Sequence, residues 1–250
     1  MYNNFMKTAV VSGASYGLGK EISKQLLEND FKVYGISRSD PKLNSKDFVW
    51  VQADLSQLQK LSEIADKIGE NKIDLLVNNA GIAFTTSAVD YKEEEFEKMF
   101  GMNFKLPILL TKSLFGKLQG GQVINISSTS DRYPDPGYGL YGSSKAALNL
   151  YFEIMAAENK DVKIINVLPS YIDTPLLHKI LEGQEFDLNL AMSVEDVTKG
   201  ILGLILDDEQ VKSGARVMII KSEKAEFDDG VYYPEDLWLY TTSDGKMRKT

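Results

Sequence analysis

Short apolar runs alternate with helical patterns along most of this chain, and this alternation limits the folds open to it. The helical patterns repeat apolar residues at three- and four-residue spacing, as Leu61, Ile64 and Ile68 do. Strands that alternate with helices predict a parallel sheet with right-handed crossovers and helices on both faces. We therefore expect an α/β fold with a doubly wound parallel sheet of about seven strands. The expected strands cover residues 8–11, 31–36, 48–52, 73–77, 121–126, 162–168 and 215–220.

Length, charge and cysteine content narrow the class of protein. The 250 residues suit one domain over 1–222, followed by an extension over 223–250. The formal charge of −8 argues against binding to nucleic acid or to anionic membranes. The absence of cysteine excludes disulfides and thiolate ligands, and we expect no metal site. Because no signal peptide or long apolar run is seen, the cytoplasm is the expected location.

A glycine-rich turn joins the first expected strand to the first expected helix. It reads Ser12-Gly13-Ala14-Ser15-Tyr16-Gly17-Leu18-Gly19. In the order strand, turn, helix, such glycines let the backbone approach a pyrophosphate, while the N–H groups of the helix N-terminus point at it. A glycine-rich turn without a ligand is the alternative.

The second expected strand ends at Ser37-Arg38-Ser39, with no acidic residue at its tip. At this place in a dinucleotide-binding fold, an acidic residue accepts the ribose 2′-hydroxyl of NAD, whereas an arginine suits the 2′-phosphate of NADP. Arg38 therefore favours NADP(H), and NAD(H) stays an alternative. A surface arginine without a ligand is the other interpretation.

Polar residues follow the later expected strands as well. Residues 78–81, Asn-Asn-Ala-Gly, follow the fourth strand and Ser127-Ser128 follow the fifth, at the end of the sheet where open α/β folds bind ligands. Asp54, after the third strand, is either a site residue or a helix cap. Asn103 and Pro107 interrupt a long helical pattern, where we expect a structural hydrogen bond and a kink.

A later helix is expected to open at Tyr141-Gly142-Ser143-Ser144-Lys145, which places the tyrosine and the lysine on one helix face. An ammonium beside a phenol favours the phenolate and lowers the phenol pKa from its usual value of about 10. The pair is therefore a candidate for proton transfer near neutral pH. A solvated helical pair without chemistry is the alternative.

Together these motifs resemble the short-chain dehydrogenase/reductase family across residues 6–221. The resemblance implies a Rossmann-type sheet in the strand order 3-2-1-4-5-6-7, and it makes 1–222 a dinucleotide-binding catalytic domain. It also implies an NADP(H)-dependent oxidoreductase that interconverts a carbonyl and an alcohol. A non-catalytic NAD(P)-binding sensor and a scaffolding protein stay alternatives. The matching motifs are the glycine loop, Asp54, residues 78–81, Asn103, Ser128, Tyr141 with Lys145, Pro169 and Thr174.

The resemblance assigns a role to each member of a catalytic set. Tyr141 would exchange a proton with the substrate oxygen, and Ser128 would hydrogen-bond that oxygen. Ser127 is the competing serine and Tyr138 the competing tyrosine, although no lysine follows Tyr138 at the same spacing. Lys145 would hold the nicotinamide ribose and depress the tyrosine pKa together with the nicotinamide charge. The implied catalytic set is Asn103, Ser128, Tyr141 and Lys145, in which Asn103 would anchor a water that relays protons.

Cofactor contacts follow from the same resemblance, in order from the diphosphate to the nicotinamide. They are Gly13, Ser15, Gly17, Leu18 and Gly19 at the diphosphate, Arg38 at the 2′-phosphate, Asp54 and Leu55 at the adenine, Asn79 at the adenosine ribose, Ile172 and Thr174 at the carboxamide, and in addition Ala80, Gly81, Tyr141, Lys145 and Pro169.

The chain departs from the family pattern in two places. Ser170 stands where the family usually has glycine, so the loop after the sixth strand is expected to differ in shape. The chain also continues past its last expected strand with an aromatic-rich segment that includes Phe227, Tyr232 and Tyr233. We expect residues 231–242 to be extended, to end in a turn, and to pack on the body or on a neighbouring subunit near the substrate mouth.

The substrate pocket is expected between residues 129–138, Tyr171 and a mobile lid over about 175–192. Tyrosines in these segments predict a partly aromatic pocket for a small carbonyl or alcohol. We expect the remaining charged or titratable side chains nearby, Asp131, Arg132, Asp135 and the single histidine His178, to be solvated.

Members of the family commonly form dimers or tetramers by pairing the helices that begin near Asp90 and Tyr141. The resemblance therefore implies a homodimer or a homotetramer. The apolar residues Leu148, Tyr151, Phe152 and Met155 belong either to that interface or to the core.

Overall fold

The computed structural model describes residues 6–183, 185–206, 211–222 and 237–249. Within these residues, nine strands form one sheet in the order β3-β2-β1-β4-β5-β6-β7-β8-β9. Neighbouring strands are parallel except for the antiparallel pair β8 and β9. The order predicted for the first seven strands is confirmed. The strands are β1 (Lys7–Ser12), β2 (Phe31–Ser37), β3 (Phe48–Gln52), β4 (Leu75–Asn78), β5 (Gln122–Ile126), β6 (Lys163–Pro169), β7 (Ala215–Ile220), β8 (Trp238–Thr241) and β9 (Lys246–Lys249).

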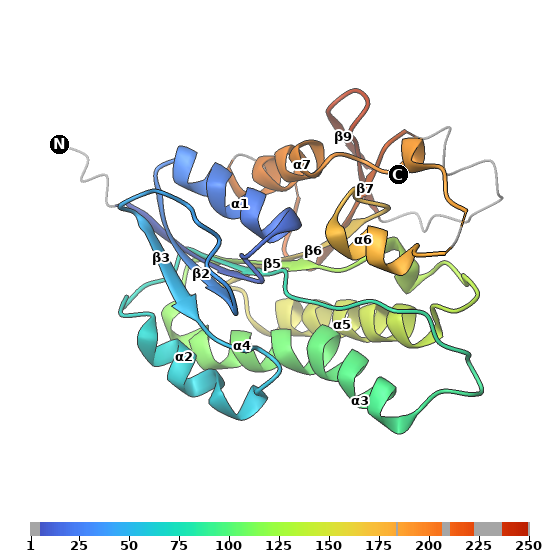
Figure 1. Ribbon diagram of the computed structural model, residues 1–250. Coiled ribbons are helices and arrows are strands. Elements are labelled where there is room, and N and C mark those ends of the chain that lie inside the picture. Colours follow the sequence, from blue (N-terminus) through green and yellow to red (C-terminus); the bar gives the residue numbers. More distant parts are fainter. Residues whose placement is uncertain (1–5, 184, 207–210, 223–236, 250) are drawn as a thin grey trace.

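Helices cover both faces of the sheet, as the alternating pattern predicts (Figure 1). One apolar core joins the sheet to α1 (Gly17–Glu28) and α7 (Val194–Leu206). A second core joins the other face to α2 (Leu61–Lys67), α4 (Leu106–Leu114) and α5 (Gly139–Glu158). The central strands bury side chains on both faces of the sheet, which explains why their sequences are almost uninterrupted apolar runs.

The predicted interruption of the long helical pattern is a π turn, Gly101–Lys105 (η2), between α3 (Glu93–Phe100) and α4. Pro107 lies in the first turn of α4, where its missing N–H is tolerated. Asn103 lies within the π turn and is 1% exposed. Its side-chain amide donates to the carbonyl of Ile82 (2.9 Å), and its carbonyl accepts from the Ile82 N–H (2.9 Å). The structural hydrogen bonds expected of Asn103 are therefore present.

Three buried asparagines cross the middle of the sheet side by side. Asn78 on β4 is paired in register with Asn125 on β5, which is paired with Asn166 on β6. The side-chain amide of Asn78 donates to that of Asn125 (2.8 Å), and the amide of Asn125 donates to that of Asn166 (2.9 Å). Asn166 in turn donates to the backbone carbonyl of Asn149 on α5 (3.1 Å). Because an unbonded buried amide group is costly, the bonds of this ladder favour one register of the strands and one position of α5.

The C-terminal segment adds a hairpin to the edge of the sheet. Strand β8 pairs with β7, and the buried side chains of Leu237 and Leu239 join a small core with Met218 and Ile220. Tyr240 packs on α7 at Gly200, where an added Cβ would lie 2.6 Å from the tyrosine ring. Of the residues predicted to be extended, 231–236 lie outside the described residues, as do Phe227, Tyr232 and Tyr233.

Candidate active site

A cavity of about 810 Å³ lies at the carboxyl ends of the strands. It extends from the glycine loop to Tyr141, so one space joins the predicted cofactor and catalytic residues. Gly19 and Asn103 are the predicted site residues that do not line it. Those that do are Gly13, Ser15, Gly17, Leu18, Arg38, Asp54, Leu55, Asn79, Ala80, Gly81, Ser128, Tyr141, Lys145, Pro169, Ile172 and Thr174.

The glycine loop has a shape that other residues cannot take. Gly13 and Gly17 have φ of 73° and 57°, in the left-handed region. A Cβ on Gly19 would lie 2.3 Å from the carbonyl oxygen of Gly13, so Gly19 supports the loop from behind. Asn79 holds the loop in place, because its amide donates to the carbonyls of Ser12 (3.0 Å) and Gly13 (3.2 Å). The resemblance assigns Asn79 to a ribose and does not predict this contact.

The N-terminus of α1 faces the same cavity at Gly17 and Leu18. Tyr16 precedes the helix without a side-chain cap, and the first turn contains no acidic residue. The first N–H groups of α1 are therefore available to an anion, and the helix dipole favours one there. With the close backbone approach at the glycines, these residues fit a dinucleotide diphosphate.

At the adenosine end of the cavity, Arg38 and Asp54 both face the space. Asp54 accepts hydrogen bonds from the N–H (3.0 Å) and the hydroxyl (2.8 Å) of Ser56, which close a turn after β3. These bonds, and to a smaller extent the Arg38 guanidinium, lower the pKa of Asp54. A carboxylate and a guanidinium are therefore both charged where the ribose and its substituent would lie.

The predicted tyrosine and lysine lie on the first turns of α5. Lys145 is 5% exposed, and its ammonium donates to the Ile126 carbonyl at the end of β5 (2.9 Å). The Lys145 Nζ is 5.8 Å from the centroid of the Tyr141 ring. Ser128 lies near enough to the Tyr141 phenol to lower its pKa, and the Ser128 hydroxyl donates to the Ser130 hydroxyl (3.2 Å). The Ser127 hydroxyl is buried without a partner among the described residues. The structure thus brings Tyr141, Lys145 and Ser128 together.

In the polypeptide alone, burial is the largest influence on the pKa values of Tyr141 and Lys145. It raises the pKa of Tyr141, and Ser128 opposes that rise. Burial lowers the pKa of Lys145 to about 8, so the ammonium is still mostly charged at neutral pH. The lowering of the tyrosine pKa expected from the spacing of Tyr141 and Lys145 is not seen, because burial of the phenol is the largest influence on that pKa.

Asn103 lies behind the cavity wall at Gly81. A Cβ on Gly81 would lie 3.1 Å from the Asn103 carbonyl oxygen and 3.7 Å from the Lys145 Nζ. Because Gly81 has no side chain, a narrow space remains between Asn103 and Lys145. The amide of Asn103 also donates to Ser144 on α5 (3.2 Å), which ties the π turn to the helix that carries Lys145.

Ser170 begins the loop after β6. The Ser170 N–H donates to the Ile219 carbonyl (2.9 Å), and its backbone is not in the left-handed region. The serine therefore extends the pairing of β6 with β7 without backbone strain. Thr174 caps α6 (Pro175–Ile180) through a hydrogen bond from the Leu177 N–H (3.3 Å), and its methyl group faces Gly17.

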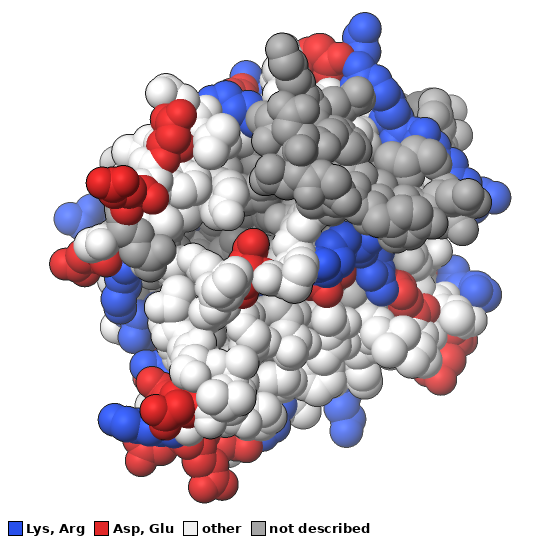
Figure 2. All heavy atoms as spheres, turned by 90° about the vertical axis from the view of Figure 1, so that its right-hand side faces the viewer, with Lys and Arg blue, Asp and Glu red and all other residues white. Residues whose placement is uncertain are grey.

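The substrate end of the cavity is largely aromatic. The rings of Tyr138 and Tyr141 meet edge to face at 6.3 Å, and those of Tyr171 and Phe186 at 4.8 Å. The face that carries α6 and the start of α5 shows a broad area of uncharged side chains below its centre, with one acidic side chain and a small group of basic and acidic side chains at the centre itself (Figure 2). Phe186 and Ile180 line the cavity within the segment that was expected to form the lid. Lys98 and Met102 line it from outside the segments predicted for the substrate pocket.

The expectation that Asp131 is solvated is wrong. Its side chain is 1% exposed and is bonded to two arginines, Arg132 and Arg216. Arg132 is also mostly buried, with 13% of its side chain exposed. Asp135 is exposed, as expected, and His178 is 54% exposed beside Asp173. The described residues contain no group of three or more His, Cys, Asp or Glu side chains able to hold a metal ion, and none of their helices is long and apolar enough to cross a membrane.

Comparisons with known proteins show the family to which the chain belongs. The family model for short chain dehydrogenase matches residues 7–185. Benzil reductase ((S)-benzoin forming) from Bacillus cereus is 29% identical over 86% of this chain and 99% of its own length. Carbonyl reductase [NADPH] 2 from Sus scrofa is 26% identical over 84% of this chain and 93% of its own. The structure of ElxO with NADP bound superposes with a TM-score of 0.76, at 28% identity over 86% of this chain and 97% of that one. The chain therefore belongs to the short-chain dehydrogenase family of oxidoreductases.

Proposed function

We propose that this protein is an NADP(H)-dependent carbonyl reductase or alcohol dehydrogenase with Tyr141 as its proton donor and acceptor. The observation that carries the proposal is the single cavity that joins the glycine loop to Tyr141, Ser128 and Lys145. When bound, the nicotinamide supplies or accepts the hydride. The chain's own residues then have to orient the carbonyl and move one proton.

Each residue of the catalytic set has a distinct task in this proposal. Ser128 and Tyr141 line the same cavity, and Ser128 is near enough to influence the Tyr141 phenol, so both can bond one substrate oxygen and stabilise the charge that develops on it. In the reductive direction Tyr141 donates its proton, and its raised pKa keeps that proton on the phenol of the free protein until it is transferred. The buried Lys145 ammonium stabilises the phenolate that remains. Asn103, behind Gly81, is the proposed anchor of the water that returns the proton.

The proposed function is tested by following NADPH absorbance with a panel of aldehydes, ketones and diketones. The aromatic wall of the cavity and the names of the two curated relatives support uncharged carbonyls with aromatic groups as the first choice. Turnover of at least one such compound is expected. If NADPH binds and none is turned over, the non-catalytic sensor on the same fold is the better account.

Arg38 is the proposed selector of NADP(H) over NAD(H). Arg38→Ala should lower the ratio of kcat/KM for NADPH to that for NADH by about 10–100-fold, because a charge-assisted hydrogen bond to the 2′-phosphate is lost. Lys42→Ala is the matched control, since Lys42 carries the same charge nearby but does not line the cavity. A ratio unchanged by Arg38→Ala would refute this assignment.

We further propose that a second copy of the chain covers the outer face of α4 and α5. Leu109, Leu150, Tyr151 and Ile154 are between 38% and 56% exposed there, whereas Leu148 and Phe152 belong to the core. Adjacent large apolar side chains of this kind are typical of an interface between protein chains. Light scattering should therefore give a multiple of the 27.9 kDa chain mass, and Ile154→Glu should lower that mass. A wild-type mass of one chain would contradict the proposal.

A further inference from the structure

Two separate segments carry the groups that would act on the substrate oxygen. Tyr141 and Lys145 belong to α5, whereas Ser128 begins the 3₁₀ turn Thr129–Asp131 (η4) after β5. The Ser128 hydroxyl caps this turn, because it accepts from the N–H of Ser130 (3.2 Å). Its position relative to the Tyr141 phenol therefore depends on how the turn is held against α5.

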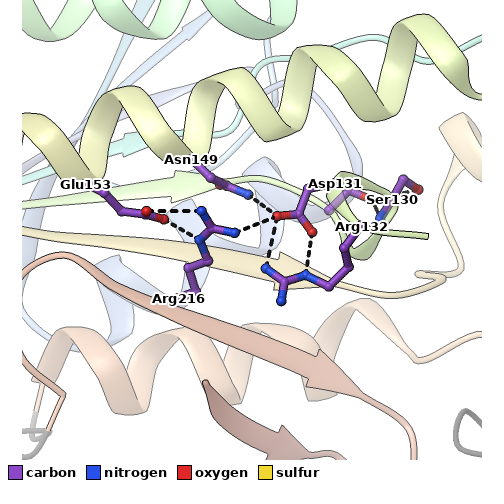
Figure 3. Close-up of polar contacts among 7 residues, drawn as sticks. Ser130, Asp131, Arg132, Asn149, Glu153 and Arg216 are labelled. Atoms are coloured by element: carbon purple, nitrogen blue, oxygen red, sulfur yellow. Dashed lines mark hydrogen bonds and ion pairs between the residues drawn. The ribbon is translucent and has the colours of Figure 1, made fainter. Parts of the chain in front are cut away.

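The turn ends at Asp131, whose buried carboxylate joins three segments of the chain (Figure 3). It accepts from the amide of Asn149 on α5 (2.8 Å) and from the guanidinium of Arg216 on β7 (3.2 Å). It also accepts two bonds from Arg132 (2.9 and 3.1 Å). Arg216 is held in turn by Glu153 on α5, so the two carboxylates balance the two guanidinium groups.

The helix side of this connection lies close to the catalytic pair. Asn149 is one helical turn after Lys145 on the same face of α5. Its backbone carbonyl accepts from Asn166, the last member of the asparagine ladder. The carboxylate of Asp131 is therefore bonded to a point on α5 that the sheet itself fixes.

Buried ion pairs are a weak source of stability, because desolvation offsets most of the attraction between the charges. They do fix geometry, since each bond has a narrow range of distance and angle. We propose that Asp131 is a positioning residue, which places the Ser128 hydroxyl against the Tyr141 phenol by holding the turn 129–131 to α5 and β7. This inference rests on the proposed function.

The first test is Asp131→Asn, which keeps the side-chain shape and removes the charge. The amide would present N–H groups to arginine donors, so the turn should shift. Because small misplacements of a positioned group are costly, kcat should fall by about 10–100-fold. The Kd of NADPH should change by less than about twofold, since the glycine loop is formed by other segments. Glu153→Gln is the matched control: it removes the other carboxylate of the cluster but leaves the bonds of Asp131, and kcat should change by less than about threefold.

A double-mutant cycle separates positioning from a general loss of structure. If Asp131 acts through Ser128, Asp131→Asn should lower kcat by less than about threefold in a Ser128→Ala background. Equal fold-losses in both backgrounds would overturn the inference. If Asp131→Asn does not fold, Asn149→Ser is used in the same cycle, because it breaks the bond to α5 and keeps the charges paired.

A titration of the Tyr141 phenol gives a readout that needs no turnover. The signal is the phenolate absorbance of each protein minus that of its Tyr141→Phe counterpart. Because Ser128 lowers the phenol pKa, Asp131→Asn should raise that pKa in the wild-type background and leave it unchanged beside Ser128→Ala. An unshifted titration would contradict the inference even if the enzyme is active. If the titration shifts as expected but the protein reduces no carbonyl, the positioning role of Asp131 stands and the proposed function is refuted.

Discussion

Tyr141→Phe should lower kcat for carbonyl reduction by about 10²–10⁴-fold, the contribution expected of a positioned proton donor. The substitution removes the phenol oxygen, whose pKa is influenced by Ser128. The ring centroid of Tyr141 lies 5.8 Å from the Lys145 Nζ. Because the ring itself remains, packing at the start of α5 should be preserved. NADPH binding should therefore be nearly unchanged, and the loss should appear in kcat. Steady-state kinetics with a separate binding titration measure both quantities.

Tyr138→Phe is the matched control for this prediction. Tyr138 lines the same cavity, and its ring is 6.3 Å from that of Tyr141, but no lysine follows it at the same spacing. Its loss of kcat should stay below about tenfold. The assignment would move to Tyr138 if that variant lost activity by the larger factor while Tyr141→Phe did not.

Truncation after Ser222 should destabilise the protein by at least about 5 kcal/mol, a large part of the total stability of a domain. It removes Leu237 and Leu239, which are 2% and 3% exposed, and leaves β7 as an unpaired edge strand. The melting temperature should fall by about 10–20 °C. KM for the substrate should also rise, because Tyr133 packs on the core that these leucines complete and also lines the cavity.

Point variants separate this packing from other effects of truncation. Leu239→Ala should cost about 2–5 kcal/mol, as expected for a fully buried leucine. Leu206→Ala, at a side chain that is 42% exposed, should cost less than about 1 kcal/mol. A truncated protein with the melting temperature and KM of the full chain would show that the C-terminal hairpin plays neither role.

The sheet could be predicted from the sequence because its signals are local. Each of the first seven strands is a short apolar run next to a turn, and the strand order that the family resemblance implied is the one observed. The interruption of the helix at the π turn could also be predicted, since an asparagine and a proline both interrupt the helical pattern there. The glycine loop was recognisable because its residues must adopt left-handed backbone or lie against another backbone atom. The catalytic roles assigned by resemblance stay predictions.

Features that depend on distant parts of the chain could not be predicted in this way. Asp131 and Arg216 are separated by 85 residues, and only the folded sheet shows that they form a buried pair. The asparagine ladder was missed for a similar reason, because it requires the strand order before three separate asparagines can be matched. Strand β8 was expected only as extended chain before a turn, and β9 was not expected, since the pairing of both depends on the free edge of β7.

The proposal that this protein transfers hydride to a carbonyl is tested most directly with NADPH that carries deuterium at the transferred position. The product alcohol is isolated from reactions with aromatic aldehydes, ketones and diketones, and its mass is measured. We predict one deuterium on the former carbonyl carbon with the wild-type protein, and almost none in the same time with Tyr141→Phe. NADPH binding without deuterium in any product across the panel would contradict the proposed function.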